Sequence, residues 1–123
     1  MAWRWDKVAY SGDIRKMFNQ VLVHPDDQVF HRFLWRSDKS ETPSVFQWLR
    51  LNFGDKPAPD IALNAINYLA KVSQVEFPDA AQELRDHAYV DDIAGSQSNS
   101  TEAKKITKEI YTVLRKGKFQ FKA

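Results

Sequence analysis

Two adjacent aspartates, Asp91 and Asp92, interrupt an apolar segment that runs from residue 88 to residue 94. A buried carboxylate is costly unless it is paired, hydrogen-bonded or bound to a metal. Two carboxylates at one corner add like-charge repulsion, which a divalent cation removes. The same pair also suits a polar β-turn at the surface, because Asp is a favoured turn residue. The segment therefore predicts a strand, a tight corner and a return strand, with a metal site as one of two interpretations.

The donor types at this corner limit which metal could bind there. Hard carboxylate oxygens, with no Cys or His in the motif, favour Mg²⁺ or Mn²⁺ over Zn²⁺. The chain contains no cysteine, which excludes disulfides and thiolate metal sites and fits a reducing, intracellular (cytoplasmic) compartment. No apolar run approaches the ~20 residues of a membrane span, and no signal-peptide core is present, so we expect no membrane partner.

The apolar pattern predicts one α+β domain over residues 1–123, because helices interleave with the strands of an antiparallel sheet. We expect a ferredoxin-like layer with two main helices on one face of the sheet. The expected elements are an extended segment at 8–23 interrupted near 16–19, a hairpin of 30–36 with 45–51, two helices of which the second covers 78–85, the strands around the Asp91-Asp92 corner, a last helix and a strand at 119–122.

Two helices carry the clearest periodicity. Asp60 is the expected cap of the first, and Ser100 of the last, which Gly117 should end. The expected apolar faces are Ile61, Ala65, Tyr68, Leu69 and Val72 on the first, and Ala103, Ile106, Ile110, Val113 and Leu114 on the last.

The charge balance gives a weak indication of a partner. A formal net charge of +2 is too small to establish nucleic-acid binding. Residues 104–122 are locally basic, but their lysines lie opposite the apolar face of the last helix. A solvated helix face explains them better than contact with a phosphate backbone.

A third aspartate, Asp13, ends the first apolar strand and is followed by Phe18. A strand, a hairpin, a helix and then Tyr89-Val90-Asp91-Asp92 come after it, in the order of a reverse transcriptase palm. The segments 13–21, 25–27, 32–36 and 51–59 are similar to those of the Bel/Pao group of long-terminal-repeat retrotransposons, and the resemblance covers about residues 6–122.

This resemblance implies a function and a set of site residues. The function is that of an RNA-directed DNA polymerase, with a template-primer nucleic acid and a dNTP as partners. Asp13, Asp91 and Asp92 would be the catalytic residues, with Asp13 and Asp91 holding two Mg²⁺ (or Mn²⁺) ions and Asp92 contributing less directly. The nucleotide-binding residues would be Ile14 through its backbone amide, Phe18 beneath the sugar, and Gly54 at a close backbone approach.

Simpler interpretations exist for several of these residues. Phe18 could be an ordinary core residue, and Gly54 a plain turn glycine. The three histidines lack metal-ligand spacing relative to each other, so we expect no chemistry from them. A lysine that protonates pyrophosphate cannot be assigned among Lys116, Lys118 and Lys122.

The chain is short for a working polymerase of this family, whose fingers and thumb subdomains flank the palm. We expect the isolated palm to bind metal weakly and to be inactive. We also expect self-association through exposed aromatics, with Trp3, Trp5, Trp48 and Phe121 as candidates. The alternatives are a truncated or domesticated retroelement piece that acts by binding alone, and an unrelated domain with a chance Asp-Asp turn.

Overall fold

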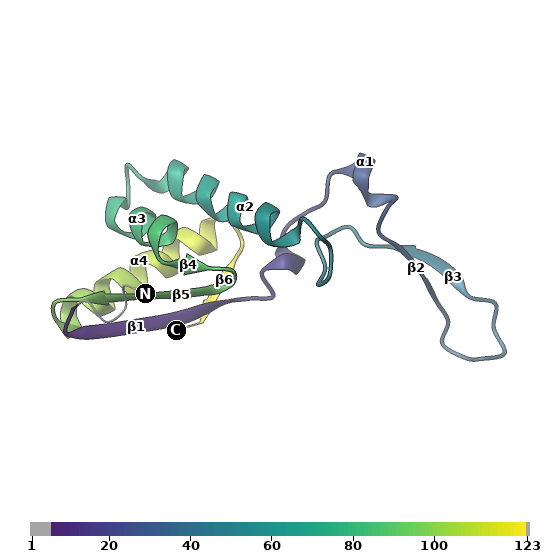
Figure 1. Ribbon diagram of the computed structural model, residues 1–123, viewed down its shortest axis with the longest axis horizontal. Helices are drawn as coiled ribbons and strands as arrows, with labels where there is room; N and C mark the ends of the chain where they lie inside the picture. Colours follow the sequence, from purple (N-terminus) through teal and green to yellow (C-terminus); the bar gives the residue numbers. More distant parts are fainter. Residues whose placement is uncertain (1–5, 123) are drawn as a thin grey trace.

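The computed structural model describes residues 6–122, and within them the predicted α+β class is confirmed. The strand order in the main sheet is β4-β5-β1-β6, and every neighbouring pair is antiparallel. The helices α2, α3 and α4 cover one face of this sheet (Figure 1). The elements are β1 (Val8–Arg15), the 3₁₀ turn η2 (Phe18–Gln20), α1 (Pro25–Gln28), β2 (Arg32–Trp35), β3 (Ser44–Gln47), α2 (Ala58–Ser73), α3 (Pro78–Asp86), β4 (Ala88–Tyr89), β5 (Asp92–Gln97), α4 (Ser100–Lys116) and β6 (Gln120–Lys122).

The side chains of β1 alternate between the two faces of the sheet. Its even-numbered residues are partly or fully buried and its odd-numbered residues are exposed. Ile14 and its neighbour on β6, Phe121, point into the core between sheet and helices. The odd-numbered side chains, including Asp13, therefore lie on the open face, away from the helices.

The expected apolar face of α2 is right for Leu69, which is buried, and for Ala65, which packs partly buried against the core, but wrong for the other three residues. Ala58, Ala62, Ile66, Leu69, Ala70 and Ser73 are buried. Ile61, Tyr68 and Val72 are exposed, and Tyr68 keeps 68% of its surface. The buried stripe is rich in alanine, and small side chains allow neighbouring helices to approach closely. The prediction favoured the larger apolar side chains of the helix, whereas in the structure the face with the smaller side chains packs against its neighbours.

The buried face of α4 is predicted correctly, but its cap is not. All five expected residues are buried, and the helix ends at Gly117. The N-cap is Asn99, whose side chain accepts a hydrogen bond from the backbone N–H of Glu102 at 2.9 Å. Ser100 is the first helical residue. The first turn of α2 also differs, because Pro57 is its N-cap and Asp60 lies inside the helix.

The β2–β3 hairpin projects from the body as an arm (Figure 1). Both strands are shorter than expected and all eight of their residues are exposed. Hydrogen bonds at the base, between Val23 N–H and Leu49 C=O and between Leu51 N–H and Val21 C=O, join the arm to the body. The ion pair of His31 with Asp55, at 3.3 Å, lies at the same base.

The expected exposed aromatics have mixed outcomes. Trp48 is exposed at 39%. Phe121 is buried, because its alternation with Gln120 and Lys122 directs it into the core. Trp3 and Trp5 lie outside the described residues. Within residues 6–122, no helix has the length and hydropathy required to cross a bilayer.

Candidate functional site

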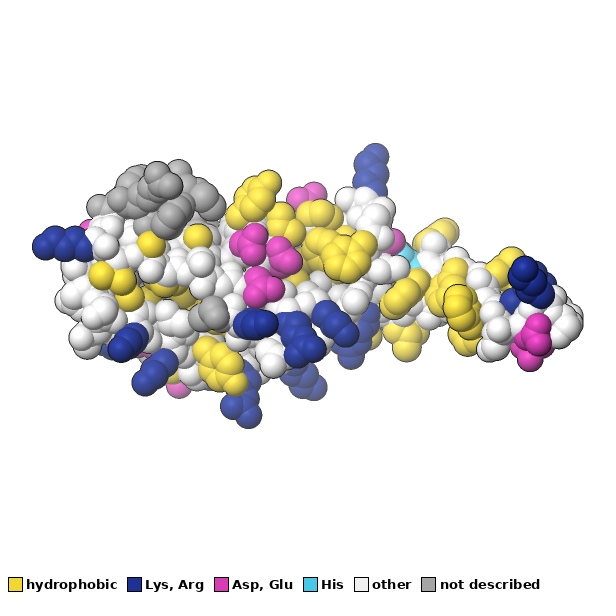
Figure 2. All heavy atoms as spheres, turned by 90° about the horizontal axis from the view of Figure 1, so that it is seen from below, with side chains coloured by type: hydrophobic (Ala, Val, Ile, Leu, Met, Phe, Trp, Pro, Cys, Tyr) yellow, Lys and Arg dark blue, Asp and Glu magenta, His cyan; other side chains and the backbone are white. Residues whose placement is uncertain are grey.

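The sheet register brings two of the three predicted carboxylates together. Asp13 on β1 lies directly opposite Asp92 on β5, and on its other side it lies opposite Lys122 on β6. Directly opposed residues point to the same face of a sheet, with neighbouring Cβ atoms about 5 Å apart. Asp13, Asp92 and Lys122 line one shallow hollow on the open face. Figure 2 shows this face, where acidic side chains gather beside lysine and arginine side chains.

Asp91 lies in the turn between β4 and β5. Tyr89 and Asp92 are paired, so Val90 and Asp91 form a two-residue corner. The carbonyl oxygen of Asp91 accepts a hydrogen bond from the backbone N–H of Ile14 at 2.7 Å. This bond fixes the corner against β1. It also occupies the amide of Ile14, which was expected to face a triphosphate, so that amide is not free in this structure.

Val90 has a left-handed backbone, with φ of 52°. A β-branched residue is unfavourable there, at a cost of roughly 1–2 kcal/mol. Such strain persists only where surrounding contacts hold it, and it concentrates at functional sites. Here the β4–β5 pairing and the Ile14–Asp91 hydrogen bond hold the corner.

The predicted carboxylates have the oxygen donors that a divalent cation prefers, but the three of them do not form a complete ligand set. Asp13 and Asp92 supply hard oxygen donors, and two like charges directly opposite each other destabilise a sheet, so either the Lys122 ammonium or a metal ion near them would be stabilising. Among residues 6–122, however, no three His, Cys, Asp or Glu side chains form a group that could hold a metal ion. The register therefore unites Asp13 with Asp92, and the Asp91 carboxylate is not part of such a group.

The two other expected nucleotide residues lie in adjacent loops. Phe18 begins η2 and is partly buried against the core, as its simpler interpretation requires. Its ring lies edge-on to that of Phe53, with centroids 5.4 Å apart. Gly54 follows with φ of 88°, and a Cβ there would meet nothing within 4 Å. Phe53 thus brings Gly54 close to Phe18, and their roles in nucleotide binding stay predictions.

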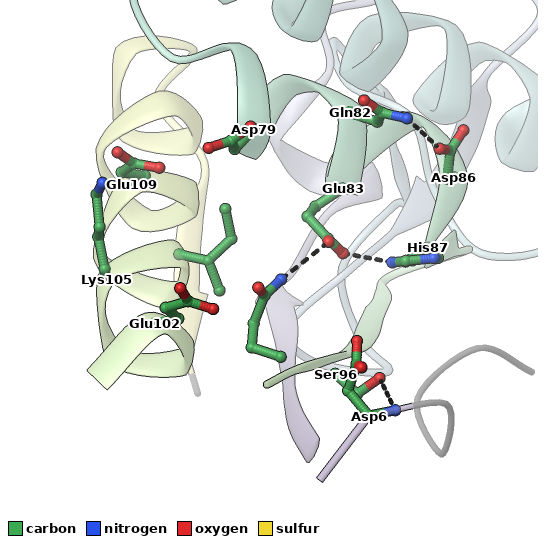
Figure 3. A pocket seen from close by; sticks show the side chains of 12 residues that line it. Asp6, Asp79, Gln82, Glu83, Asp86, His87, Ser96, Glu102, Lys105 and Glu109 are labelled. Carbon is green, nitrogen blue, oxygen red and sulfur yellow. Dashed lines mark hydrogen bonds and ion pairs between the residues drawn. The ribbon is translucent and has the colours of Figure 1, made fainter. Parts of the chain in front are cut away.

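A polar network on the helix-facing side of the sheet was not predicted from the sequence. The Glu83 carboxylate on α3 accepts a hydrogen bond from the Tyr10 hydroxyl and contacts His87 Nδ1. Its other oxygen accepts from the side chain of Gln97 at 3.3 Å. Figure 3 shows Glu83 reaching from α3 toward His87, in a hollow where half of the lining residues are acidic. Burial, together with the hydrogen bond and charge of Glu83, raises the pKa of Tyr10 well above its ordinary value.

All three histidines have structural partners. His24 caps α1 through a hydrogen bond from the backbone of Asp26, His31 pairs with Asp55, and His87 pairs with Glu83. The only sequence signal for the Glu83 network was Gly95 inside a strand, because such a glycine often marks a close approach.

One comparison with known proteins identifies a family. The sequence model described as reverse transcriptase (RNA-dependent DNA polymerase) matches residues 4–123. No curated protein matches the chain.

Proposed function

Because the chain belongs to the reverse transcriptase family, we propose that it is the catalytic palm of an RNA-directed DNA polymerase. We further propose that the parent element is of the Bel/Pao type and that Asp13, Asp91 and Asp92 hold the catalytic Mg²⁺ (or Mn²⁺). The observation that supports this proposal is the pairing of Asp13 with Asp92 on the open face. Members of the family normally use a divalent metal and bind template-primer and dNTP. Nothing favours the alternative of a binding module without catalysis.

The chain's own residues have distinct parts in this mechanism. Asp13 and Asp92 would hold the cations together with Asp91, whose corner the Ile14–Asp91 backbone hydrogen bond keeps in place beside β1. Two such ions would activate the primer 3′-hydroxyl and stabilise the departing pyrophosphate. The ring of Phe18 lies beneath the sugar, where it leaves no room for a 2′-hydroxyl, and Gly54 allows a close backbone approach.

Lys122 is the lysine best placed to give a proton to pyrophosphate. It lies directly opposite Asp13 on the open face. Lys116, in contrast, pairs with Glu76 and lies 5.1 Å from the centre of the Phe77 ring. We therefore propose Lys122 over Lys116 for this part.

A Mn²⁺ titration of the purified chain, followed by water-proton relaxation, tests the metal site. We expect weak binding because the carboxylates lie on an open, hydrated face, where ionic interactions are screened. Asp13→Asn and Asp92→Asn should each lower the affinity by roughly tenfold, as for the loss of one charged ligand. Asp26→Asn is a matched control, since Asp26-Asp27 is the other adjacent aspartate pair. Equal affinity in all four proteins would contradict the site.

Primer extension on a homopolymeric RNA template tests the activity. We propose that the 123-residue chain alone gives no product, because one open sheet face does not enclose a primer terminus. Product that disappears in Asp92→Asn would establish the polymerase and refute the expected inactivity. Product that persists in Asp92→Asn would point to a contaminant.

The arm provides a further proposal, that the chain self-associates. Phe33, Trp35, Phe46 and Trp48 are all exposed on it. Exposed apolar surface of this kind, on a hairpin with two free edges, favours association with another chain.

A further inference from the structure

The proposed metal site depends on the register of β1 against β5. A slip by one residue would move Asp13 to the opposite face from Asp92, and a slip by two would place it opposite Val90 or Ala94, depending on the direction of the slip. The backbone hydrogen bonds of an antiparallel pair are similar after a two-residue slip. Side chains must therefore select the register that brings the carboxylates together.

The Tyr10 side chain can pass over β5 to reach Glu83 at one position only. It lies opposite Gly95, where an added Cβ would come within 2.5 Å of the Tyr10 hydroxyl oxygen and 2.8 Å of a Glu83 carboxylate oxygen. Gly95 is the only glycine in β5. After a two-residue slip, Tyr10 would face Ile93 or Gln97, whose side chains occupy the same layer. The native register alone gives the tyrosine a path to Glu83.

Glu83 connects the two strands that carry Asp13 and Asp92. It bonds Tyr10 on β1, Gln97 on β5 and His87, which directly precedes β4. The side chain of Glu83 is only 14% exposed, so these contacts are largely shielded from water. A buried carboxylate that lost its donors would be strongly destabilised, which makes the set of contacts mutually dependent.

We propose that Tyr10, Gly95 and Glu83 form a register lock that holds Asp13 opposite Asp92. They are positioning residues, because they lie on the helix-facing side of the sheet while the carboxylates lie on the open face. The lock acts three residues away from the carboxylates along both strands, at Tyr10 on β1 and Gly95 on β5. Its functional meaning rests on the proposed metal site, but the register can be measured without it.

Disulfide trapping measures the register directly, and the chain contains no cysteine that would interfere. Ser11→Cys with Ala94→Cys reports the native register, because these residues are directly opposed on the open face. Ala9→Cys with Ala94→Cys reports the two-residue slip that places Asp13 opposite Val90, because Ala9 is natively opposite Ser96 and would then lie opposite Ala94. A diagonal pair about 7–8 Å apart does not form a disulfide without backbone movement.

Both cysteine pairs are placed in an otherwise wild-type chain and equilibrated in a glutathione redox buffer. The native-register pair should then form its disulfide, and the slipped-register pair should form none. Tyr10→Phe should lower the native disulfide equilibrium constant by roughly two- to tenfold, as expected for one lost hydrogen bond. Tyr10→Ala and Gly95→Ala should lower it further, and the slipped disulfide should appear. Tyr111→Ala, at a half-exposed tyrosine of α4, is the matched control and should change nothing.

An unchanged native disulfide in Tyr10→Ala and in Gly95→Ala, with circular dichroism showing both folded, would overturn the lock. If either variant fails to fold, Tyr10→Phe decides, and wild-type values for both disulfides would overturn the lock as well. The Mn²⁺ titration separates the two proposals. Absent binding in wild type, together with a shifted disulfide equilibrium in Tyr10→Phe, would refute the metal site and support the lock. Mn²⁺ binding that is weakened by Asp13→Asn but unchanged by substitution of Tyr10 or Gly95 would support the metal site and refute the lock.

Discussion

At the scale of single residues, the corner between β4 and β5 stores strain at Val90. Asn tolerates the left-handed region better than a β-branched residue does. Val90→Asn should therefore raise the free energy of unfolding by about 1 kcal/mol, whereas Val90→Ile should give no gain. Urea denaturation measures both. Val75→Asn is the control at an exposed valine without positive φ, and a gain of equal size there would show that the benefit is not conformational.

Tyr10 gives stability a dependence on alkaline pH. In the unfolded chain a tyrosine loses its proton near the ordinary pKa of 10.0, whereas burial and Glu83 raise the pKa of Tyr10 in the folded state. Below pH 10 both states are protonated and the full stability is present. Above it the folded state binds more protons, so the free energy of unfolding falls as pH rises, by at most about 1.4 kcal/mol per pH unit.

Tyr10→Phe should remove this part of the slope. Urea denaturation at intervals from pH 9 to pH 11 should show a steeper fall for the wild type than for the variant. Tyr111→Phe should keep the wild-type slope. Parallel slopes for the wild type and Tyr10→Phe would contradict the raised pKa of Tyr10 that burial and Glu83 cause.

The sequence indicated Asp13, Asp91 and Asp92 as candidates because acidic residues at strand ends conflict with their apolar neighbours. It did not indicate Glu83 or Tyr10, which are separated by 73 residues and are unremarkable in their local segments. Their contact exists only because β1 and α3 come together in the fold. A local sequence pattern identifies polar residues that stand among apolar neighbours. A hydrogen-bond network between distant segments leaves no such pattern in the sequence.

At the scale of elements, α2 shows where periodicity misleads. The helix carries two apolar stripes that share Leu69, and the prediction chose the one with the larger side chains. Ile66 lies on the buried stripe and Ile61 on the exposed one. The same substitution at both positions therefore compares the two faces with the chemistry held constant.

Ile66→Ala should lower the free energy of unfolding by about 2–5 kcal/mol, because it leaves a cavity in the core. Ile61→Ala should lower it by less than about 1 kcal/mol. Thermal or urea denaturation decides between the faces, and a larger loss at Ile61 would restore the sequence-based assignment.

At the scale of the whole molecule, the order of strands and helices follows from the sequence, but the shape does not. Alternating and helical periodicities identify elements, and the antiparallel arrangement follows from their order. The projecting arm has the same apolar, strand-like composition as a buried hairpin. Whether such a hairpin is covered depends on what packs against it, which local pattern does not encode.

The arm leads to the last prediction, because an isolated two-stranded hairpin is marginal in water. The rings of Phe33, Phe46 and Trp48 cluster on it, with Phe33 5.7 Å from Phe46 and 5.8 Å from Trp48. Contact with another chain would remove this surface from water, so we expect the wild type to exceed its monomer mass of 14.3 kDa in light scattering as concentration rises. Phe33→Ser combined with Phe46→Ser should shift the protein toward the monomer, whereas Tyr68→Ser, at an even more exposed aromatic on α2, should not. A monomer at every concentration in the wild type would show that the arm is stable uncovered, and equal shifts in both variants would show that association does not depend on the arm.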